Sequence, residues 1–123
     1  MANLLILEDQ ESVYQLMNIV FGDMFKYNIT RVTNGQEGLE VLAKMNPKPD
    51  VILCDYNMPG MCGDEFLYQL RSNPEFSQKS IVIGTGDFPL DRQGGLAGNF
   101  PKPHNLSTYT EIDNLINERL KKT

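Results

Sequence analysis

The chain has 123 residues, of which 41% are hydrophobic and 22% are charged, and this size and composition are ordinary for one soluble globular domain. Its formal net charge of −5 at pH 7 leaves no surplus of basic side chains for the phosphates of a nucleic acid. No apolar run reaches the length of a membrane span, and the N-terminus lacks the basic start of a secretion signal. We therefore expect one cytoplasmic domain, residues 1–123, that binds neither nucleic acid nor membrane.

The first part of the chain predicts a strand, a helix and a second strand. Residues 3–7 form a compact apolar run, which is typical of a buried strand, and Glu8 and Asp9 follow it directly. From Gln10 onward the apolar side chains recur at steps of three and four, which predicts a helix with one buried face. Residues 27–32 predict a short strand near a sheet edge, because polar residues interrupt it. The side chains expected on the buried face of the helix are Val13, Leu16, Met17, Val20 and Phe21.

A second helix is bounded by clear start and stop signals. Residues 33–35, with the sequence Thr-Asn-Gly, have the chemistry of a turn and a helix cap. Asn46 and Pro47 end the helix, because proline restricts the residue before it and cannot continue the hydrogen-bond ladder. The apolar positions expected to face the core are Leu39, Val41, Leu42 and Met45.

The central feature of the sequence is an apolar run that leads straight into an acid. Residues 51–54 predict a strand that is buried on both faces, and Asp55 comes next. Pro59, Gly60 and Gly63 interrupt regular structure just beyond it, so the chain must turn there. Asp55 is thereby expected at the carboxyl end of a central strand, where open α/β sheets place their sites. A carboxylate in that place can be a nucleophile, a metal ligand or the cap of a turn.

The remaining part of the chain predicts a third helix over residues 64–71 and a fourth strand over residues 80–84. Residues 88–98 contain one proline and three glycines with little periodicity, which predicts a loop or at most one helical turn. Phe100 is expected within a very short fifth strand. The inward-facing side chains of the third helix are expected to be Phe66, Leu67 and Leu70.

A last helix is predicted from about Ser107 or Thr108 to the end of the chain. Thr108 and Glu111 have the spacing of a capping box, and basic residues suit the C-terminus of the helix. Its apolar stripe is expected to consist of Ile112, Leu115, Ile116 and Leu120. Cys54, within the central strand, and Cys62, in the loop after it, are expected to be free thiols, and His104 is expected to be a plain loop residue.

Strands that alternate with helices favour a parallel sheet with helices on both faces. Right-handed crossovers then bring the ends of all strands, with the loops that follow them, to one edge of the sheet. Acidic, hydroxyl or basic side chains that suit phosphate chemistry follow the first, third, fourth and fifth predicted strands. The side chains expected to converge at that edge are Glu8, Asp9, Asp55, Thr85 and Lys102.

Such a set of side chains suits the chemistry of an aspartyl phosphate. Neighbouring carboxylates repel one another unless a cation joins them, and ligands that are all oxygen favour a hard divalent ion such as Mg²⁺. The ammonium of Lys102 suits a phosphate oxygen, and Thr85 offers a hydroxyl donor. We therefore expect Asp55 to attack a phosphoryl group while Mg²⁺ and Lys102 neutralise the developing charge.

These motifs, in this order, resemble the receiver domain of two-component response regulators over the whole chain. The resemblance rests on Glu8-Asp9, on the run Asp55-x-x-Met58-Pro59-x-x-x-Gly63, on Thr85 and on Lys102-Pro103. It implies a flavodoxin-like (CheY-like), doubly wound, five-stranded parallel sheet of order 2-1-3-4-5. It also implies phosphorylation by a histidine kinase or a histidine phosphotransfer protein, in a chain that catalyses its own phosphorylation and dephosphorylation and is mainly a signalling protein.

The resemblance also implies roles for individual residues. Asp9, Asp55 and the backbone carbonyl of Asn57 would hold Mg²⁺, with Glu8 acting through water, and the Lys102–Pro103 bond would be cis. Asn57 and Asp87 stand where the family tunes hydrolysis of the acyl phosphate, which favours a short-lived phosphoryl state.

Two departures from the family pattern concern how the signal leaves the domain. The segment between Thr85 and Lys102 is short, so the fourth helix is expected to be shortened or replaced by a loop, as in single-domain receivers with a Thr-Gly pair after strand four. Asn99 occupies the position, three before the lysine, where a switch aromatic is usual, so Phe100 is the candidate partner of Thr85. We expect output to pass through residues 87–99, which would order on phosphorylation.

Three other functions compete with that of a phosphoacceptor switch without an output domain. A receiver-shaped docking module that is not phosphorylated remains the alternative. A flavodoxin needs a phosphate-binding loop after strand one, and the acids at Glu8 and Asp9 oppose it. A phosphatase of the haloacid dehalogenase kind needs a second aspartate where Asn57 stands. The kinase and the downstream target stay open, and we expect a monomer or a weak dimer.

Overall fold

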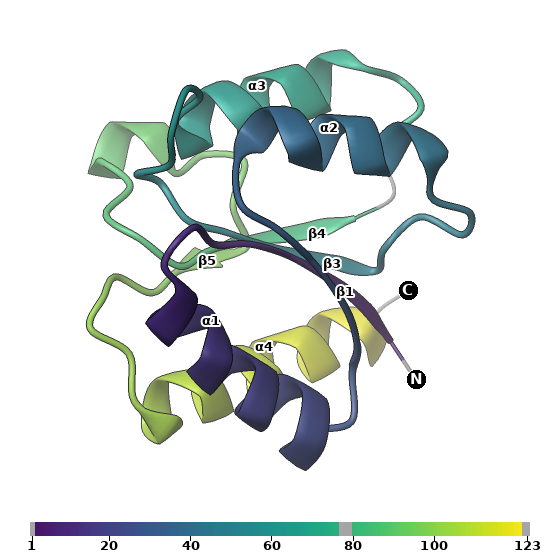
Figure 1. Ribbon diagram of the computed structural model, residues 1–123. Helices are drawn as coiled ribbons and strands as arrows, with labels where there is room; N and C mark the ends of the chain where they lie inside the picture. Colours follow the sequence, from purple (N-terminus) through teal and green to yellow (C-terminus); the bar gives the residue numbers. More distant parts are fainter. Residues whose placement is uncertain (1, 77–79, 122–123) are drawn as a thin grey trace.

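The computed structural model describes residues 2–76 and 80–121. Five parallel strands form one sheet in the order β2-β1-β3-β4-β5, as the resemblance implied (Figure 1). β3 lies in the middle with every residue buried, and β2 lies at an edge, both as predicted. The strands are β1 (Asn3–Leu7), β2 (Asn28–Val32), β3 (Val51–Cys54), β4 (Ile81–Gly84) and β5 (Gly98–Asn99).

Helices cover both faces of the sheet and bury a separate apolar cluster on each. α2 (Gly35–Lys44) and α3 (Gly63–Ser72) lie on one face (Figure 1). α1 (Glu11–Met17), its continuation η1 (Asn18–Met24) and α4 (Leu106–Lys121) lie on the other. In the described part of the chain, none of the helices has the length and hydropathy needed to span a bilayer.

The first predicted helix forms, but its second half is a π-helix, η1, and one of its expected core residues is exposed. Met17, Val20 and Phe21 are buried as predicted, whereas Leu16 keeps 41% of its surface exposed. Leu16 precedes Met17 by one position, which is about 100° around a helix. It therefore lies at the edge of the apolar stripe, and its assignment to the core was wrong.

The second helix begins where the sequence predicts, and the third begins one residue earlier, at Gly63, and ends one residue later, at Ser72. The side chain of Asn34 caps α2 by accepting a hydrogen bond of 2.8 Å from the backbone N–H of Glu37. In α3, Phe66, Leu67 and Leu70 are buried against the sheet, as their spacing indicated.

The connection between β4 and β5 carries no full helix. A single 3₁₀ turn, η2 (Leu90–Arg92), stands where the family has its fourth helix, as expected from the shortened sequence. The prediction that Phe100 lies within β5 was wrong, because the strand ends at Asn99. The N–H of Phe100 still donates to the carbonyl of Gly84 at 2.8 Å, but Pro101 has no N–H with which to extend the ladder.

The start of α4 also differs from the prediction. The N–H of Thr108 donates to Oδ1 of Asn105 at 2.9 Å, and the N–H of Asn105 donates to Oγ1 of Thr108 at 3.2 Å. Asn105 is thus the N-cap residue of α4, and Thr108 bonds back to it. The prediction that Thr108 caps the helix in a capping box with Glu111 was wrong. Asparagine caps helices as well as serine or threonine does, so the helix begins at Leu106. Residues 122–123 of the predicted helix lie outside the described residues.

Candidate functional site

Three polar residues continue the three central strands by one position each. The backbone N–H of Glu8 donates to Val32 O at 3.1 Å, that of Asp55 to Leu7 O at 3.1 Å, and that of Thr85 to Cys54 O at 2.9 Å. The sheet ladder therefore fixes these three backbones at one edge. All three residues are buried, with Glu8 and Thr85 having no exposed surface.

The carboxylates of Glu8, Asp9 and Asp55 form a cluster, with one oxygen of each lying within 4.8 Å of the others. Oε1 of Glu8 and Oδ1 of Asp9 are buried without a hydrogen-bond partner in the described residues. Buried acceptors without donors within the chain are suited to contact a bound cation. Since every donor atom is an oxygen, the cluster fits Mg²⁺.

Lys102 joins this cluster from the loop after β5. Its ammonium donates to Oε2 of Glu8 at 2.9 Å, to Oδ2 of Asp55 at 3.0 Å and to Oε1 of Gln10 at 3.0 Å. Burial lowers the pKa of Lys102, but its hydrogen bonds to the two carboxylates outweigh this, and the net shift is upward. For Glu8, burial raises the pKa, and the bond from Lys102 only partly opposes it.

The two oxygens of Asp55 have different surroundings. Oδ2 accepts from Lys102, while Oδ1 accepts from the backbone N–H of Tyr56 at 2.8 Å. The space beside Oδ1 is open because Gly86 stands there. A Cβ atom at Gly86 would overlap Oδ1 and lie 2.8 Å from the nitrogen of Tyr56. Only glycine leaves the carboxylate accessible from this side.

The other predicted site residues lie around these acids. The hydroxyl of Thr85 is buried, and no hydrogen-bond partner for it lies within residues 2–76 and 80–121. Asn57 is exposed. Phe100 packs in the apolar cluster under α1 and α4, whereas the side chain of Asn99 faces Gly84, where a Cβ would overlap its Oδ1. The side chains of Asn99, the last residue of β5, and of Phe100, which follows it, therefore lie on opposite faces of the sheet.

Sequence reasoning missed the role of His104, which is no plain loop residue. Its Nε2 donates to the carbonyl of Phe100 at 2.9 Å, and its Nδ1 lies 3.1 Å from the hydroxyl of the buried Tyr109. Burial lowers the pKa of His104, so the ring is neutral near pH 7, and burial raises the pKa of Tyr109 to about 12. The pair ties the lysine loop to α4, and no periodicity in the sequence connects them.

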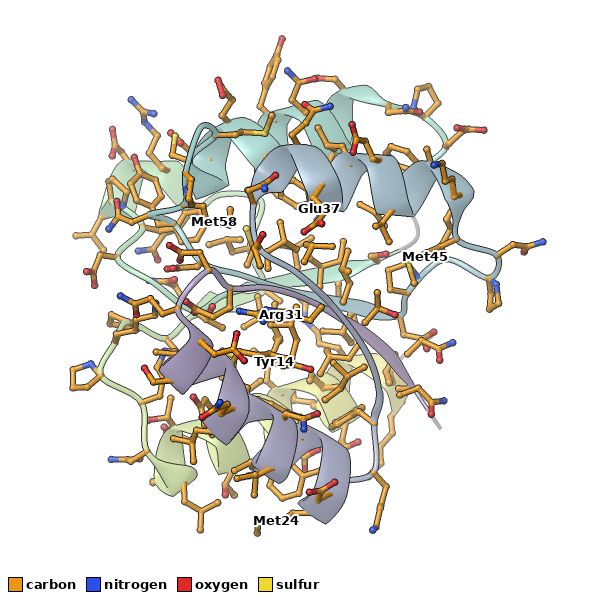
Figure 2. The ribbon with its side chains drawn as sticks, viewed as in Figure 1. Tyr14, Met24, Arg31, Glu37, Met45 and Met58 are labelled. Carbon is orange, nitrogen blue, oxygen red and sulfur yellow. The ribbon has the colours of Figure 1, made fainter. Side chains whose placement is uncertain are left out.

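Arg31 is a second unanticipated contributor, from β2. Its Nε donates to the backbone carbonyl of Glu8 at 3.1 Å, and its Nη1 to Oε2 of Glu11 at 2.8 Å. The guanidinium carbon lies 4.4 Å from the centre of the Tyr14 ring, and Figure 2 labels both side chains. Arg31 thus anchors the loop that carries the first two acids.

Comparison with known proteins places this geometry in a family. The model of the response regulator receiver domain matches residues 4–91 of the chain. Sporulation initiation phosphotransferase F of Bacillus subtilis is 28% identical over 106 residues, which span 84% of this chain and 83% of that protein. Chemotaxis protein CheY-3 of Vibrio cholerae is 26% identical over 122 residues, which span 95% of this chain and 92% of that protein.

Solved structures agree with the fold. The signal receiver domain of a signal transduction histidine kinase from Syntrophus aciditrophicus matches with a TM-score of 0.82 at 22% identity, covering 96% of this chain and 92% of that one. The chemotaxis response regulator CheY4 of Vibrio cholerae matches with a TM-score of 0.80 at 25% identity, covering 94% and 98%. At 22% identity the first of these similarities concerns the fold alone.

Proposed function

Because the chain belongs to the response regulator receiver domain family, we propose that it is a phosphoacceptor switch of a two-component or phosphorelay pathway. Asp55 accepts the phosphoryl group from a histidine kinase or a histidine phosphotransfer protein. The observation that carries this proposal is the ammonium of Lys102, which lies 3.0 Å from Oδ2 of Asp55 beside two further acids. The named functions of the relatives, phosphotransfer and chemotaxis, support it.

In the proposed reaction a carboxylate oxygen of Asp55 attacks phosphorus. The new O–P bond forms as the P–N bond of the donor phosphohistidine breaks, and the electron pair of that bond stays on the histidine nitrogen. Lys102 then turns its ammonium from the carboxylate to a phosphoryl oxygen. The buried hydroxyl of Thr85, whose hydrogen-bonding capacity is unused in the described residues, donates to another.

The acidic cluster is the proposed site of the cofactor. Asp9, Asp55 and the backbone carbonyl of Asn57 would hold Mg²⁺, and Glu8 would contribute through water. The ion, when bound, supplies positive charge to the phosphoryl oxygens.

The same site also ends the signal. Asn57 and Asp87 are exposed, and their amide and carboxylate are suited to position a water molecule against the acyl phosphate. We therefore infer a short-lived phosphoryl state in a cytoplasmic protein that is a monomer or a weak dimer. Output passes through residues 87–99, with Thr85 and Phe100 as the proposed switch pair.

Acetyl phosphate with Mg²⁺, followed by intact mass measurement, tests the central claim. The wild type is expected to gain one phosphoryl group that hydroxylamine removes, while Asp55→Asn gains none. The exposed Asp91→Asn is the matched control and should be phosphorylated like the wild type. A wild-type protein that gains no adduct would instead support the unphosphorylated docking module.

A further inference from the structure

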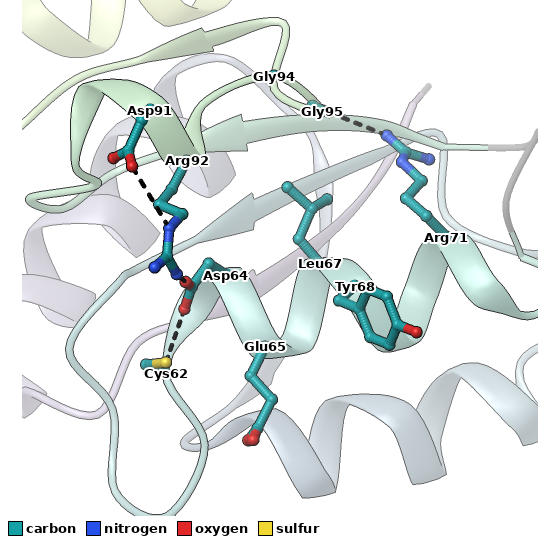
Figure 3. A pocket seen from close by; sticks show the side chains of 10 residues that line it. All are labelled: Cys62, Asp64, Glu65, Leu67, Tyr68, Arg71, Asp91, Arg92, Gly94 and Gly95. Atoms are coloured by element: carbon teal, nitrogen blue, oxygen red, sulfur yellow. Dashed lines mark hydrogen bonds and ion pairs between the residues drawn. The ribbon is translucent and has the colours of Figure 1, made fainter.

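A groove of about 660 Å³ runs along α3, outside the phosphorylation site. One wall is α3 itself, and the other is formed by residues 91–95, which comprise the end of η2 and the start of the connection to β5 (Figure 3). The groove exists because a single 3₁₀ turn replaces a full helix between β4 and β5. The loss of one helix thus leaves a hollow on this face of the fold.

The groove has an apolar floor and apolar neighbours. Leu67 projects from α3 towards the 94–95 segment, and a Cβ placed on Gly95 would lie 3.0 Å from its Cδ2 (Figure 3). On the same helix, Tyr68 leaves 72% of its surface exposed, and Leu90 of η2 leaves 90% exposed. Exposed apolar surface that is rimmed by polar residues, as along this groove, is a feature of surfaces that contact another molecule.

The charged side chains around the groove differ in whether they have hydrogen-bond or ion-pair partners within the chain. Arg92 forms an ion pair with Asp64 and lies 3.8 Å from Asp91, and Arg71 donates to the carbonyl of Gly95 at 3.2 Å. Asp64 also accepts from the thiol of Cys62 at 2.7 Å. Both arginines are therefore engaged with acceptors of the chain itself.

Glu65 is different, because it is exposed and its carboxylate has no hydrogen-bond or ion-pair partner within the described ranges. Asp91 is 82% exposed and meets Arg92 only at 3.8 Å, so most of its hydrogen-bonding capacity is open to solvent. The carboxylates of Asp64, Glu65 and Asp91 outnumber the two guanidiniums in the lining, so the groove carries one net negative charge in a chain whose net charge is −5.

We propose that this groove is the docking site for a partner protein segment in which a large apolar side chain stands next to a lysine or an arginine. The apolar side chain packs on Leu67 and Tyr68. The basic group pairs with Glu65 and Asp91. Charge complementarity gives the orientation and the choice of partner, and apolar contact supplies most of the affinity.

A chain of contacts links this groove to the phosphoacceptor, and this part of the inference rests on the proposed function. Tyr56, whose N–H bonds to Asp55, packs edge-on against the buried Phe88 with ring centres 5.0 Å apart. The carbonyl of Phe88 in turn accepts from Nε2 of Gln93, a residue of the 91–95 wall, at 2.9 Å. A change at Asp55 that moves Phe88 therefore moves residues 91–95 as well.

Selection from a dodecapeptide phage library, with the whole protein as bait, tests the docking site. The enriched sequences are expected to share an apolar residue beside a lysine or an arginine. A synthetic peptide of the enriched sequence should shift backbone amide resonances of α3 and of residues 91–95. Library selection without enrichment, a motif rich in acids, or shifts on another face would each overturn the proposal.

Matched charge reversals sharpen the test. Glu65→Lys should weaken binding of the synthetic peptide by roughly five- to tenfold, because an attraction becomes a repulsion at the rim. Glu111→Lys makes the same change on α4, on the opposite face, and should leave the affinity within about twofold. Equal effects of the two variants, or self-association of the protein through this groove instead of peptide binding, would contradict the proposal.

Beryllofluoride with Mg²⁺, used as a mimic of the phosphoryl group, tests the link to Asp55. The peptide affinity is expected to change by roughly threefold or more, in either direction. An unchanged peptide affinity, in a protein that still takes a phosphoryl group on Asp55, would refute the coupling between Asp55 and the groove but not the docking site or the proposed function. A protein that takes none would sink the proposed function, while the peptide measurements without beryllofluoride would still decide the docking site.

Discussion

The ammonium of Lys102 lies 2.9 Å from Oε2 of Glu8, a carboxylate with no exposed surface. The two residues are separated by 94 positions in the sequence, so this bond joins the end of β1 to the loop after β5. A buried charge of this kind is stable only while its partner is present. Removal of either partner alone would therefore destabilise the fold.

Replacement of Lys102 by methionine is expected to lower the free energy of unfolding by about 2–4 kcal/mol at neutral pH, because it leaves Glu8 and Asp55 buried without their cation. The double variant Glu8→Gln with Lys102→Met should regain a large part of that loss. Urea unfolding, followed by circular dichroism without added metal, measures both. Equal stability of the single and double variants would show that the pair is not coupled.

A methyl group at position 86 is expected to obstruct the phosphoacceptor. Gly86→Ala places a Cβ against Oδ1 of Asp55, so phosphorylation by acetyl phosphate should slow by roughly tenfold or more. Gly94→Ala is the matched control, because a Cβ there meets no atom within 4 Å. Rates from intact mass spectra at several times compare the two. Similar rates for both variants would argue against open access beside Gly86.

Mg²⁺ is expected to stabilise the folded protein through the acidic cluster. A ligand that binds only the folded state at about ten times its Kd adds roughly 1.4 kcal/mol, which raises the Tm by several degrees. Roughly 10 mM MgCl₂, compared with NaCl of the same ionic strength, should give this rise in the wild type and little in Asp9→Asn. An equal rise in both proteins would place the ion elsewhere.

His104 should make stability depend on pH. Its pKa is lowered in the folded protein by burial, so between the lowered value and the ordinary 6.5 the unfolded chain binds more protons. The free energy of unfolding is therefore expected to fall as the pH drops through this window. Urea unfolding at about pH 7.5 and about pH 5.5 should show a smaller difference in His104→Asn than in the wild type. It is the only histidine, so an unchanged difference would exclude its involvement.

Local patterns in the sequence sufficed wherever a residue's environment depends on its near neighbours. The apolar runs that end at Glu8 and Asp55 indicated buried strands, and the ladder does extend through both residues. Asn34 and the spacing of Phe66, Leu67 and Leu70 likewise indicated a helix start and a buried face correctly. The shortened segment after Thr85 was enough to predict the loss of the fourth helix.

The errors occurred where two good local signals competed. Asn105 and Thr108 can each begin a helix, and the sequence alone ranked the wrong one first. Phe100 has the character of a strand residue and its N–H still bonds to Gly84, but Pro101 has no N–H with which to continue the ladder, and the strand ends at Asn99. Leu16 fits the three- and four-residue spacing of the first helix, but it lies at the edge of the apolar stripe and is exposed. Whether a residue at that edge is buried depends on the element that packs against the helix.

The sequence by itself determined the order of the elements and the identity of the acids and the lysine that end them, because strand burial and chain reversal are encoded within a few residues. Only the tertiary structure decided that Gln10 and Glu8 share Lys102, that His104 joins Tyr109, and that a groove lies between α3 and residues 91–95. These features arise where separate elements meet. Their geometry follows from how helices pack on a twisted sheet, which no local pattern specifies.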